Sequence, residues 1–75
     1  MDKINFYKSV NGKAKHQGSL RIVKGELAWS KDATGEAKEI VGSLETENDP
    51  KTSPSKYLEE ITMYVRSAYF WAAAA

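Results

Sequence analysis

The first part of the chain alternates apolar and polar positions in the way that short antiparallel strands do. Residues 3–10 form the first such segment, and residues 20–23 and 26–31 repeat the half-buried pattern. Strict alternation is typical of a sheet with one covered face and one exposed face. The glycines fall between these segments, where they indicate turns. We therefore predict a meander of short antiparallel strands.

Two dipeptides predict tight turns within this meander. Asn11-Gly12 is the strongest short hairpin signal in the chain, because both residues tolerate a positive φ angle. Lys24-Gly25 predicts a second tight turn, before the third strand.

The first turn creates a conflict over which side chains face the core. A two-residue turn would place Leu20 on the face opposite Phe6, and a shift of one residue in register moves every side chain across the sheet. Two arrangements resolve the conflict. Either Gly18 is a bulge that restores the face, or residues 11–17 form a longer loop.

Residues 37–44 are predicted to form a fourth strand, with Ile40 and Val41 on opposite faces. A short helix is the alternative, because residues 35–39 are not rich in β-forming side chains.

A long helix is predicted over residues 54–75. Ser53 is a favourable capping residue, and Pro54 suits the first helical position, where no backbone donor is needed. At 100° per residue, apolar side chains gather in one wide arc that we expect to pack on the sheet. The arc contains Tyr57, Leu58, Ile61, Tyr64, Val65, Ala68, Tyr69, Trp71 and Ala72.

The opposite side of this predicted helix carries apolar residues that one sheet cannot cover. Met63 and Phe70 are seven residues apart and therefore stack along the helix, with Arg66 beside them. Methionine and aromatic side chains are enriched in the centres of protein interfaces. We interpret Met63, Arg66 and Phe70 as a protein-interaction surface.

The expected fold is α+β: a small antiparallel sheet of 3–4 strands packed on one long C-terminal helix. The chain is expected to be a single domain, 1–75, with a β-meander over 1–45, a polar loop over 46–55 and the helix over 54–75.

Composition excludes several classes of site. The 75 residues include no cysteine and one histidine, so neither a disulfide nor a thiolate metal site is available, and we predict no metal and no cofactor. No enzyme motif is present, and we predict a non-enzymatic protein. The N-terminus lacks an apolar signal segment and the apolar C-terminal run is too short to span a bilayer, so we expect a cytoplasmic protein without membrane contact.

Charge is distributed unevenly along the chain. Residues 1–24 contain six basic side chains against one acid, whereas residues 25–60 are acidic. Such asymmetry can indicate a surface for a polyanion, or two halves of a fold that attract each other. The nucleic-acid hypothesis rests on a basic N-terminal hairpin with Lys8, Lys13, Lys15, His16, Arg21 and Lys24.

Taken together, the sequence favours a small protein-interaction module. It would act as a regulator, inhibitor or accessory subunit through the outer face of the C-terminal helix, with a homodimer as one form of that interaction. A nucleic-acid-binding domain that uses the basic hairpin is the alternative.

Overall fold

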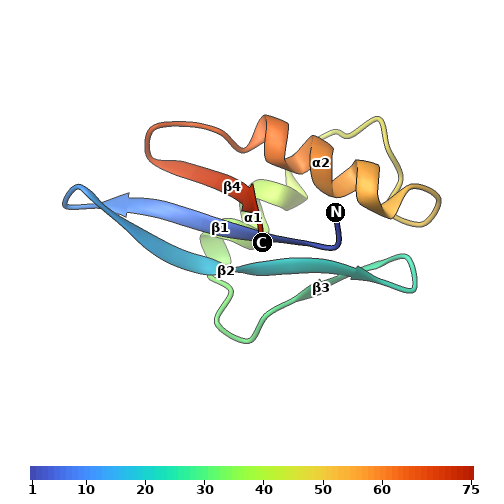
Figure 1. The fold of residues 1–75 in the computed structure, drawn as a ribbon, viewed down its shortest axis with the longest axis horizontal. Helices are drawn as coiled ribbons and strands as arrows, with labels where there is room; N and C mark the ends of the chain where they lie inside the picture. The colour runs from blue at the N-terminus through green and yellow to red at the C-terminus, as the bar shows by residue number, and fades with distance from the viewer.

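The computed structural model describes residues 1–75 and shows a four-stranded antiparallel sheet with two helices against it (Figure 1). The strand order is β3-β2-β1-β4, so the C-terminal strand pairs with the N-terminal one. The prediction of an α+β fold with an antiparallel sheet is confirmed. The elements are β1 (Lys3–Val10), β2 (Lys13–Val23), β3 (Glu26–Trp29), α1 (Gly35–Gly42), α2 (Pro54–Tyr64) and β4 (Phe70–Ala74).

Both predicted turns are present at the ends of β2. Asn11 and Gly12 have φ angles of 52° and 77°, and Lys24 and Gly25 have φ angles of 53° and 80°. Two successive positive φ angles match the type I′ turn, whose twist fits the right-handed twist of the flanking strands. Both turns therefore form hairpins with only two connecting residues.

A β-bulge resolves the conflict in the first hairpin. Tyr7 pairs with His16, but the preceding residue of β1, Phe6, pairs with Gly18, so Gln17 is an extra residue in β2. Gly18 has a φ angle of 114°. The bulge places Leu20 on the same face as Phe6, and both side chains are fully buried. Of the two arrangements left open by the sequence, the bulge is the correct one.

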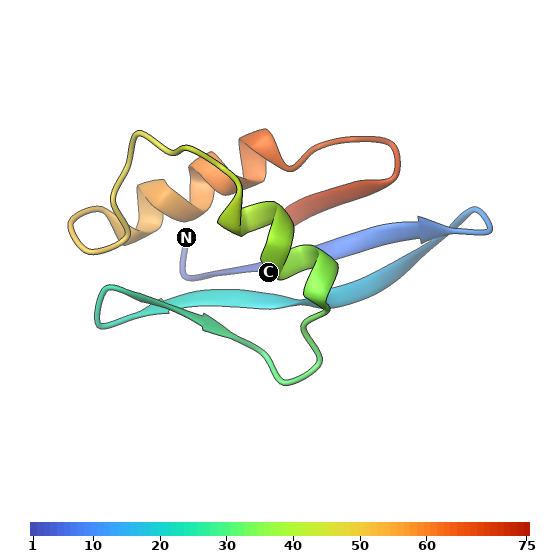
Figure 2. The same ribbon diagram turned by 180° about the vertical axis from the view of Figure 1, so that it is seen from behind.

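Both helices contribute to one buried cluster on the same face of the sheet. In the reverse view, α1 crosses in front of the strands (Figure 2). Helix α1 contributes Ala37 and Val41 to the core, and helix α2 contributes Tyr57, Leu58 and Ile61. Neither helix is long and apolar enough to cross a membrane. The buried cluster consists of Ile4, Phe6, Leu20, Ala37, Val41, Tyr57, Leu58, Ile61, Val65, Phe70 and Ala72.

The strand predicted over residues 37–44 is wrong, and the helical alternative is correct. Helix α1 begins after Thr34, whose hydroxyl accepts the Ala37 N–H at 3.3 Å and so satisfies a backbone donor of the first turn. Its Glu36 forms an ion pair with Lys8 of β1 at 2.8 Å. A helix at this position covers core side chains that a further edge strand would leave exposed.

The single long C-terminal helix is also wrong. Helix α2 starts at Pro54 as predicted, although the Ser53 side chain makes no capping hydrogen bond, and it ends at Tyr64. The chain then turns and returns as β4. Pairing with the free edge of β1 gives residues 70–74 backbone partners and core contacts together, which outweighs the helical propensity of alanine.

Because α2 ends at Tyr64 and residues 70–74 form a strand, the residues of the predicted apolar arc do not share one face. Val65 stays buried with the α2 residues of the core, but Tyr64 and Tyr69 are 52% and 77% exposed. Trp71 lies on the sheet face that the helices do not cover. Phe70 is 6% exposed and belongs to the core, so its predicted place on an outer helix face is wrong.

The polar segment between the helices is attached to α2 through Glu60. The Glu60 carboxylate accepts the backbone N–H groups of Glu47 at 2.7 Å and Asn48 at 2.9 Å, and also the Asn48 side-chain amide. Glu60 is 7% exposed. The hydrogen bond from the Glu47 N–H is the main cause that lowers the pKa of Glu60 below its usual value.

Candidate functional site

Two of the three residues predicted as a protein-interaction surface lie together, and the third does not. Met63, near the end of α2, is 72% exposed, and Arg66 is exposed just beyond the helix. Phe70 is buried on β4, so the surface cannot be the outer face of one helix. Met63 and Arg66 instead lie on the wall of a groove beside β4.

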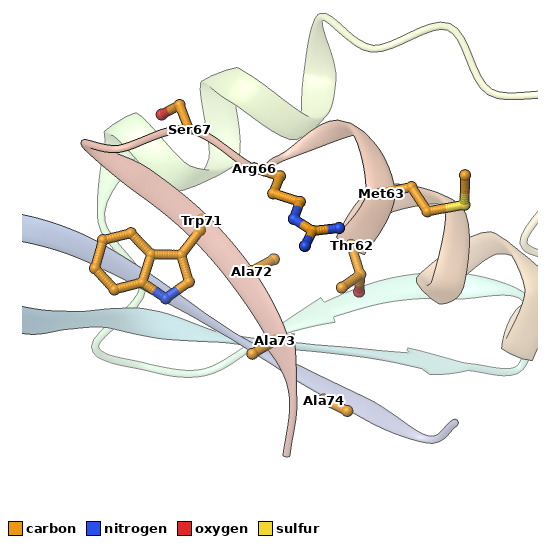
Figure 3. A pocket seen from close by; sticks show the side chains of 8 residues that line it. All are labelled: Thr62, Met63, Arg66, Ser67, Trp71, Ala72, Ala73 and Ala74. Carbon is orange, nitrogen blue, oxygen red and sulfur yellow. The ribbon is translucent and has the colours of Figure 1, made fainter.

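The groove has a volume of about 470 Å³ and runs between the end of α2 and the outer edge of β4 (Figure 3). Helix α2 contributes Thr62 and Met63 to one wall, and the other wall is the strand itself. Its size falls within the range of pockets that bind small molecules. It is lined by Thr62, Met63, Arg66, Ser67, Trp71, Ala72, Ala73 and Ala74.

Part of the outer edge of β4 is already paired with the segment that follows α2. The Ala72 N–H donates to the Val65 carbonyl at 2.9 Å, and the Ser67 N–H donates to the Phe70 carbonyl at 3.0 Å. Residues 65–67 therefore cover the first half of the edge as a short antiparallel strap.

The second half of this edge opens into the groove. The Ala75 N–H donates to the Lys3 carbonyl at 3.1 Å and so faces β1. Because backbone groups alternate sides along a strand, the Ala72 carbonyl and both backbone groups of Ala74 face away from β1. The Val65 N–H of the strap donates to the Ile61 carbonyl of α2 at 2.8 Å, so it does not pair with the Ala72 carbonyl. Alanine side chains do not shield these groups, and no charged side chain projects from β4 to block pairing.

Arg66 supplies the only charge among the residues that line the groove. Lys8 forms an ion pair with Glu36, and His16 contacts Asp32, but Arg66 contacts no acidic side chain in this way. Its side chain extends toward Thr62 across the space beside β4 (Figure 3). The groove thus combines a free strand edge, an exposed thioether and an uncompensated guanidinium group.

The residues predicted to form a basic hairpin surface are divided between different parts of the molecule. Lys8 and Lys15 pair across the strands on the side of the helices, where Lys8 binds Glu36. His16 and Arg21 point to the opposite side of β2, and Lys24 lies in the second turn. Lys13, two residues before Lys15, lies on the helix side as well. The six basic residues therefore do not form one patch.

A group of side chains on the uncovered side of the sheet was not predicted from the sequence. The Tyr7 ring lies 5.9 Å from the Trp71 ring in a stacked arrangement and 5.6 Å from the His16 ring in an edge-on arrangement, centroid to centroid. Alternation along β1 indicated that Tyr7 faces away from Phe6, which was the available signal. Trp71 had been assigned to a helix, so the row across three strands could not be found.

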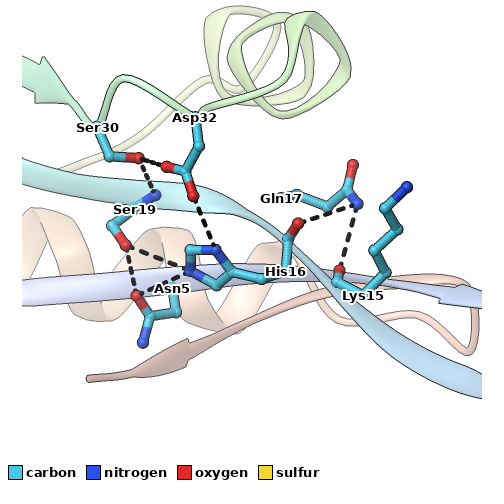
Figure 4. Close-up of polar contacts among 7 residues, drawn as sticks. All are labelled: Asn5, Lys15, His16, Gln17, Ser19, Ser30 and Asp32. Carbon is cyan, nitrogen blue, oxygen red and sulfur yellow. Dashed lines mark hydrogen bonds and ion pairs between the residues drawn. The ribbon is translucent and has the colours of Figure 1, made fainter.

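Next to this row, a polar network joins β1, β2 and the segment after β3 (Figure 4). His16 Nδ1 lies 3.3 Å from an Asp32 oxygen, and its Nε2 lies 3.5 Å from the Ser19 hydroxyl. The Ser19 hydroxyl donates to the Asn5 side-chain oxygen at 2.5 Å and is mostly buried. A hydrogen bond from the Ser30 hydroxyl is the main cause that lowers the pKa of Asp32.

This network resembles a Ser-His-Asp arrangement only in composition. A nucleophilic serine transfers its proton to the histidine and needs space for a substrate beside its hydroxyl. Here the hydroxyl proton is directed to Asn5 instead. The network is better understood as a set of cross-strand contacts that holds β2 at the bulge. No group of three or more His, Asp or Glu side chains could hold a metal ion.

Comparison with known proteins gave no match to a family model, to a curated protein or to a solved structure. A fold alone does not determine function, because unrelated functions use similar folds. Function is therefore inferred from two surfaces of the chain itself, the groove beside β4 and the uncovered face of the sheet.

Proposed function

We propose that the protein is a small, non-enzymatic interaction module that binds an extended segment of a partner protein along the outer edge of β4. The observation that carries this proposal is the free half of the β4 edge, which opens into the groove beside α2. A regulator, an inhibitor or an accessory subunit could use such a site.

The backbone of the partner would extend the sheet beyond β4. An extended segment pairs with free N–H and C=O groups of an edge strand, and these main-chain hydrogen bonds supply affinity without requiring a particular sequence. The Ala72 carbonyl and both backbone groups of Ala74 are available for such pairing. The partner segment would continue the line begun by residues 65–67, which already pair with the first half of the edge.

Side chains around the groove suggest the chemistry of the partner. Met63 offers a flexible apolar surface, which adapts to differently shaped aliphatic or aromatic side chains. Arg66 can receive a carboxylate through two parallel hydrogen bonds, and no acid in the chain occupies it. The preferred partner is therefore an extended segment with an apolar side chain and an acidic side chain.

The test is selection of peptides from a displayed random library, followed by titration of the selected peptides into isotope-labelled protein. We expect acidic, strand-forming peptides whose NMR shifts map to β4, Met63 and Arg66. Arg66→Glu should weaken binding at least about tenfold, since a charge-assisted hydrogen bond contributes about 1.5–3 kcal/mol. Lys38→Glu, which reverses an exposed charge on α1, is the matched control.

A second variant tests the backbone part of the proposal. Ala74→Pro removes an N–H group that faces the groove and leaves the ladder to β1 intact, as proline in an edge strand does. Ala74→Val keeps that N–H group and serves as its control. Shifts confined to another surface, or equal binding by the proline and valine variants, would contradict strand addition. A dimer in sedimentation that Ala74→Pro dissociates would indicate that a second copy occupies the edge.

A further inference from the structure

The uncovered face of the sheet is a second surface, separate from the groove walls formed by α2. Because side chains alternate along each strand, the residues next to the buried core positions point away from both helices. We call this surface the open face. It contains Lys3, Asn5 and Tyr7 of β1, His16, Ser19 and Arg21 of β2, Ala28 of β3, and Trp71 and Ala73 of β4.

An aromatic row crosses the open face over three adjacent strands. Trp71 of β4 and Tyr7 of β1 are stacked with an interplanar angle of 25°, and the His16 ring of β2 follows at 69° to Tyr7. Tyr7 and Trp71 are half-buried, and 41% of the His16 side chain is exposed. Their rings thus form a contiguous, partly exposed aromatic surface across three strands.

Two cations lie together to one side of this row, toward the start of β1 and the end of β2. Lys3 and Arg21 occupy directly opposite positions on β1 and β2, and neither forms an ion pair. They share a shallow pocket of about 190 Å³, which no acidic side chain lines. Like charges at opposite positions destabilise a sheet, and a bound anion would relieve that repulsion. The hydroxyl-bearing residues Ser19 and Ser30 also line this pocket.

The acids on this side of the molecule lie toward β3. Asp32 contacts His16, and Glu26 pairs with Val23 at the far end of the β2–β3 hairpin. The part of the open face that crosses β4 and β1 carries no acidic side chain. A polyanion is therefore expected to lie along β1, from the aromatic row to Lys3 and Arg21.

We propose that the open face binds single-stranded nucleic acid. Bases stack on Tyr7 and Trp71, and a phosphate of the same strand binds between Lys3 and Arg21. Tyr7 and Lys3 are four positions apart on β1, which corresponds to about 13 Å of extended chain. Bases within a duplex already stack on one another and cannot use such a platform. This proposal does not depend on peptide binding in the groove.

The experiment measures fluorescence anisotropy of labelled ten-nucleotide RNA and DNA strands of mixed sequence, with the matching duplex as a further probe, at about 50 mM salt. We expect both single strands to bind and the duplex to bind at least about tenfold more weakly. A clear preference between the RNA and DNA strands would identify the natural ligand class.

Variants connect this binding to the open face. Tyr7→Thr should reduce affinity about tenfold, whereas Tyr7→Phe, which keeps the ring, should not. Arg21→Gln should weaken binding and reduce the slope of log K against log salt by about 0.7, the value for one phosphate contact to a single strand. Lys15→Gln removes the same charge from the same strand on the opposite side and should have no effect.

Three results would overturn the proposal: no binding of either single strand, equal affinity for the duplex, or equal effects of Arg21→Gln and Lys15→Gln. If Tyr7→Thr fails to fold, Arg21→Gln still decides the question, because Arg21 is exposed. Neither Tyr7 nor Arg21 lines the groove, so Arg66→Glu and Ala74→Pro should leave nucleic-acid binding unchanged. Failure of the peptide proposal is thereby separated from failure of this one.

Discussion

At Gly18 the chain needs both an unusual backbone angle and the absence of a side chain. The φ angle is 114°, and a Cβ atom would overlap the backbone of Ala33 and approach the Ala33 Cβ at 2.7 Å. The same residue closes the bulge that directs Leu20 into the core and Arg21 to the open face. Gly18 therefore determines both the packing of β2 and the composition of the surface opposite it.

We predict that Gly18→Ala lowers the free energy of unfolding by about 2–4 kcal/mol, because backbone strain and steric overlap add. Urea denaturation followed by circular dichroism measures this loss. Gly12→Ala is the control, since Gly12 has a φ angle of 77° but nothing within 4 Å of the added Cβ. The control should lose only about 1–2 kcal/mol. Equal losses for the two variants would show that contact with Ala33 is unimportant.

Glu60 should make stability depend on pH in the acid range. Its pKa is lowered from 4.5, first by the Glu47 N–H hydrogen bond, so the folded state favours the carboxylate. A lowered pKa stabilises the fold above the unfolded pKa, and that contribution disappears as pH falls through the folded value. In Glu60→Gln, we therefore expect a lower melting temperature than the wild type at neutral pH and a smaller difference below pH 4.5.

A spectroscopic titration provides an independent check of this role. The charge of Glu60 is the main cause that raises the pKa of Tyr64. Glu60→Gln should therefore lower the Tyr64 pKa, measured from the ultraviolet absorbance of tyrosinate. A difference in melting temperature that stays constant at acid pH would contradict the linkage.

At the scale of elements, the sequence predicted correctly those boundaries that are marked by turn or helix-start residues. The Asn11-Gly12 pair specified the first hairpin, and Pro54 marked the start of α2. The end of α2 could not be found in the same way. Ile61 and Val65 continue the helical spacing of apolar residues up to the turn, and the same spacing continues after it. What stops the helix is a partner distant in sequence, the free edge of β1.

For the candidate sites too, prediction succeeded where a local pattern determines the structure and failed where a distant strand does. Met63 and Arg66 are exposed, as predicted, because they belong to or adjoin a helix that the sequence does predict. Phe70 was misplaced, and Trp71 was missed as part of the aromatic row, because both residues depend on the pairing of β4 with β1. The sheet edge itself has no signature in the sequence, since a run of alanines suggests a helix when read alone.

The turn before β4 offers a test of what redirects the chain. The Ser67 hydroxyl accepts the Phe70 N–H at 3.1 Å and the Tyr69 N–H at 3.3 Å, and donates to the Phe70 carbonyl at 3.0 Å. We predict that Ser67→Ala lowers the free energy of unfolding by about 1–2 kcal/mol without adding helix. Chemical denaturation and far-ultraviolet circular dichroism measure the two effects.

Ser53→Ala is the control for this variant, because the Ser53 side chain makes no capping hydrogen bond. It should change stability by no more than about 0.5 kcal/mol. An increase in helicity of Ser67→Ala without loss of stability would mean that the C-terminal segment can form the long helix suggested by its spacing.

For the whole molecule, the strand order joins the two ends of the chain within one sheet. Strand β1 lies between β2 and β4, so it is central only when the C-terminal segment is in place. Phe6 of β1 packs against both Trp29 and Phe70, with ring centroids 5.4 Å and 6.3 Å apart. The core therefore depends on contacts between the beginning, the middle and the end of the sequence. Both proposed binding surfaces depend on the same pairing, since β4 contributes to each.

We predict that a chain ending at Tyr69 does not fold cooperatively. It lacks Phe70, and loss of a buried phenylalanine side chain alone costs about 3–5 kcal/mol. A domain of this length has a total stability of only about 4–11 kcal/mol, and the truncation also removes the ladder between β1 and β4. Circular dichroism melting and the dispersion of amide proton NMR signals should show an unfolded or collapsed chain.

A chain ending at Ala74 is the matched control, because it loses only the hydrogen bond from Ala75 to Lys3. It should melt cooperatively, with a melting temperature close to that of the full chain. If the chain ending at Tyr69 instead melts as sharply as this control, then β1, β2 and the helices form a stable unit alone. Strand β4 would in that case be a replaceable edge, one that a segment of a partner protein could occupy in its place.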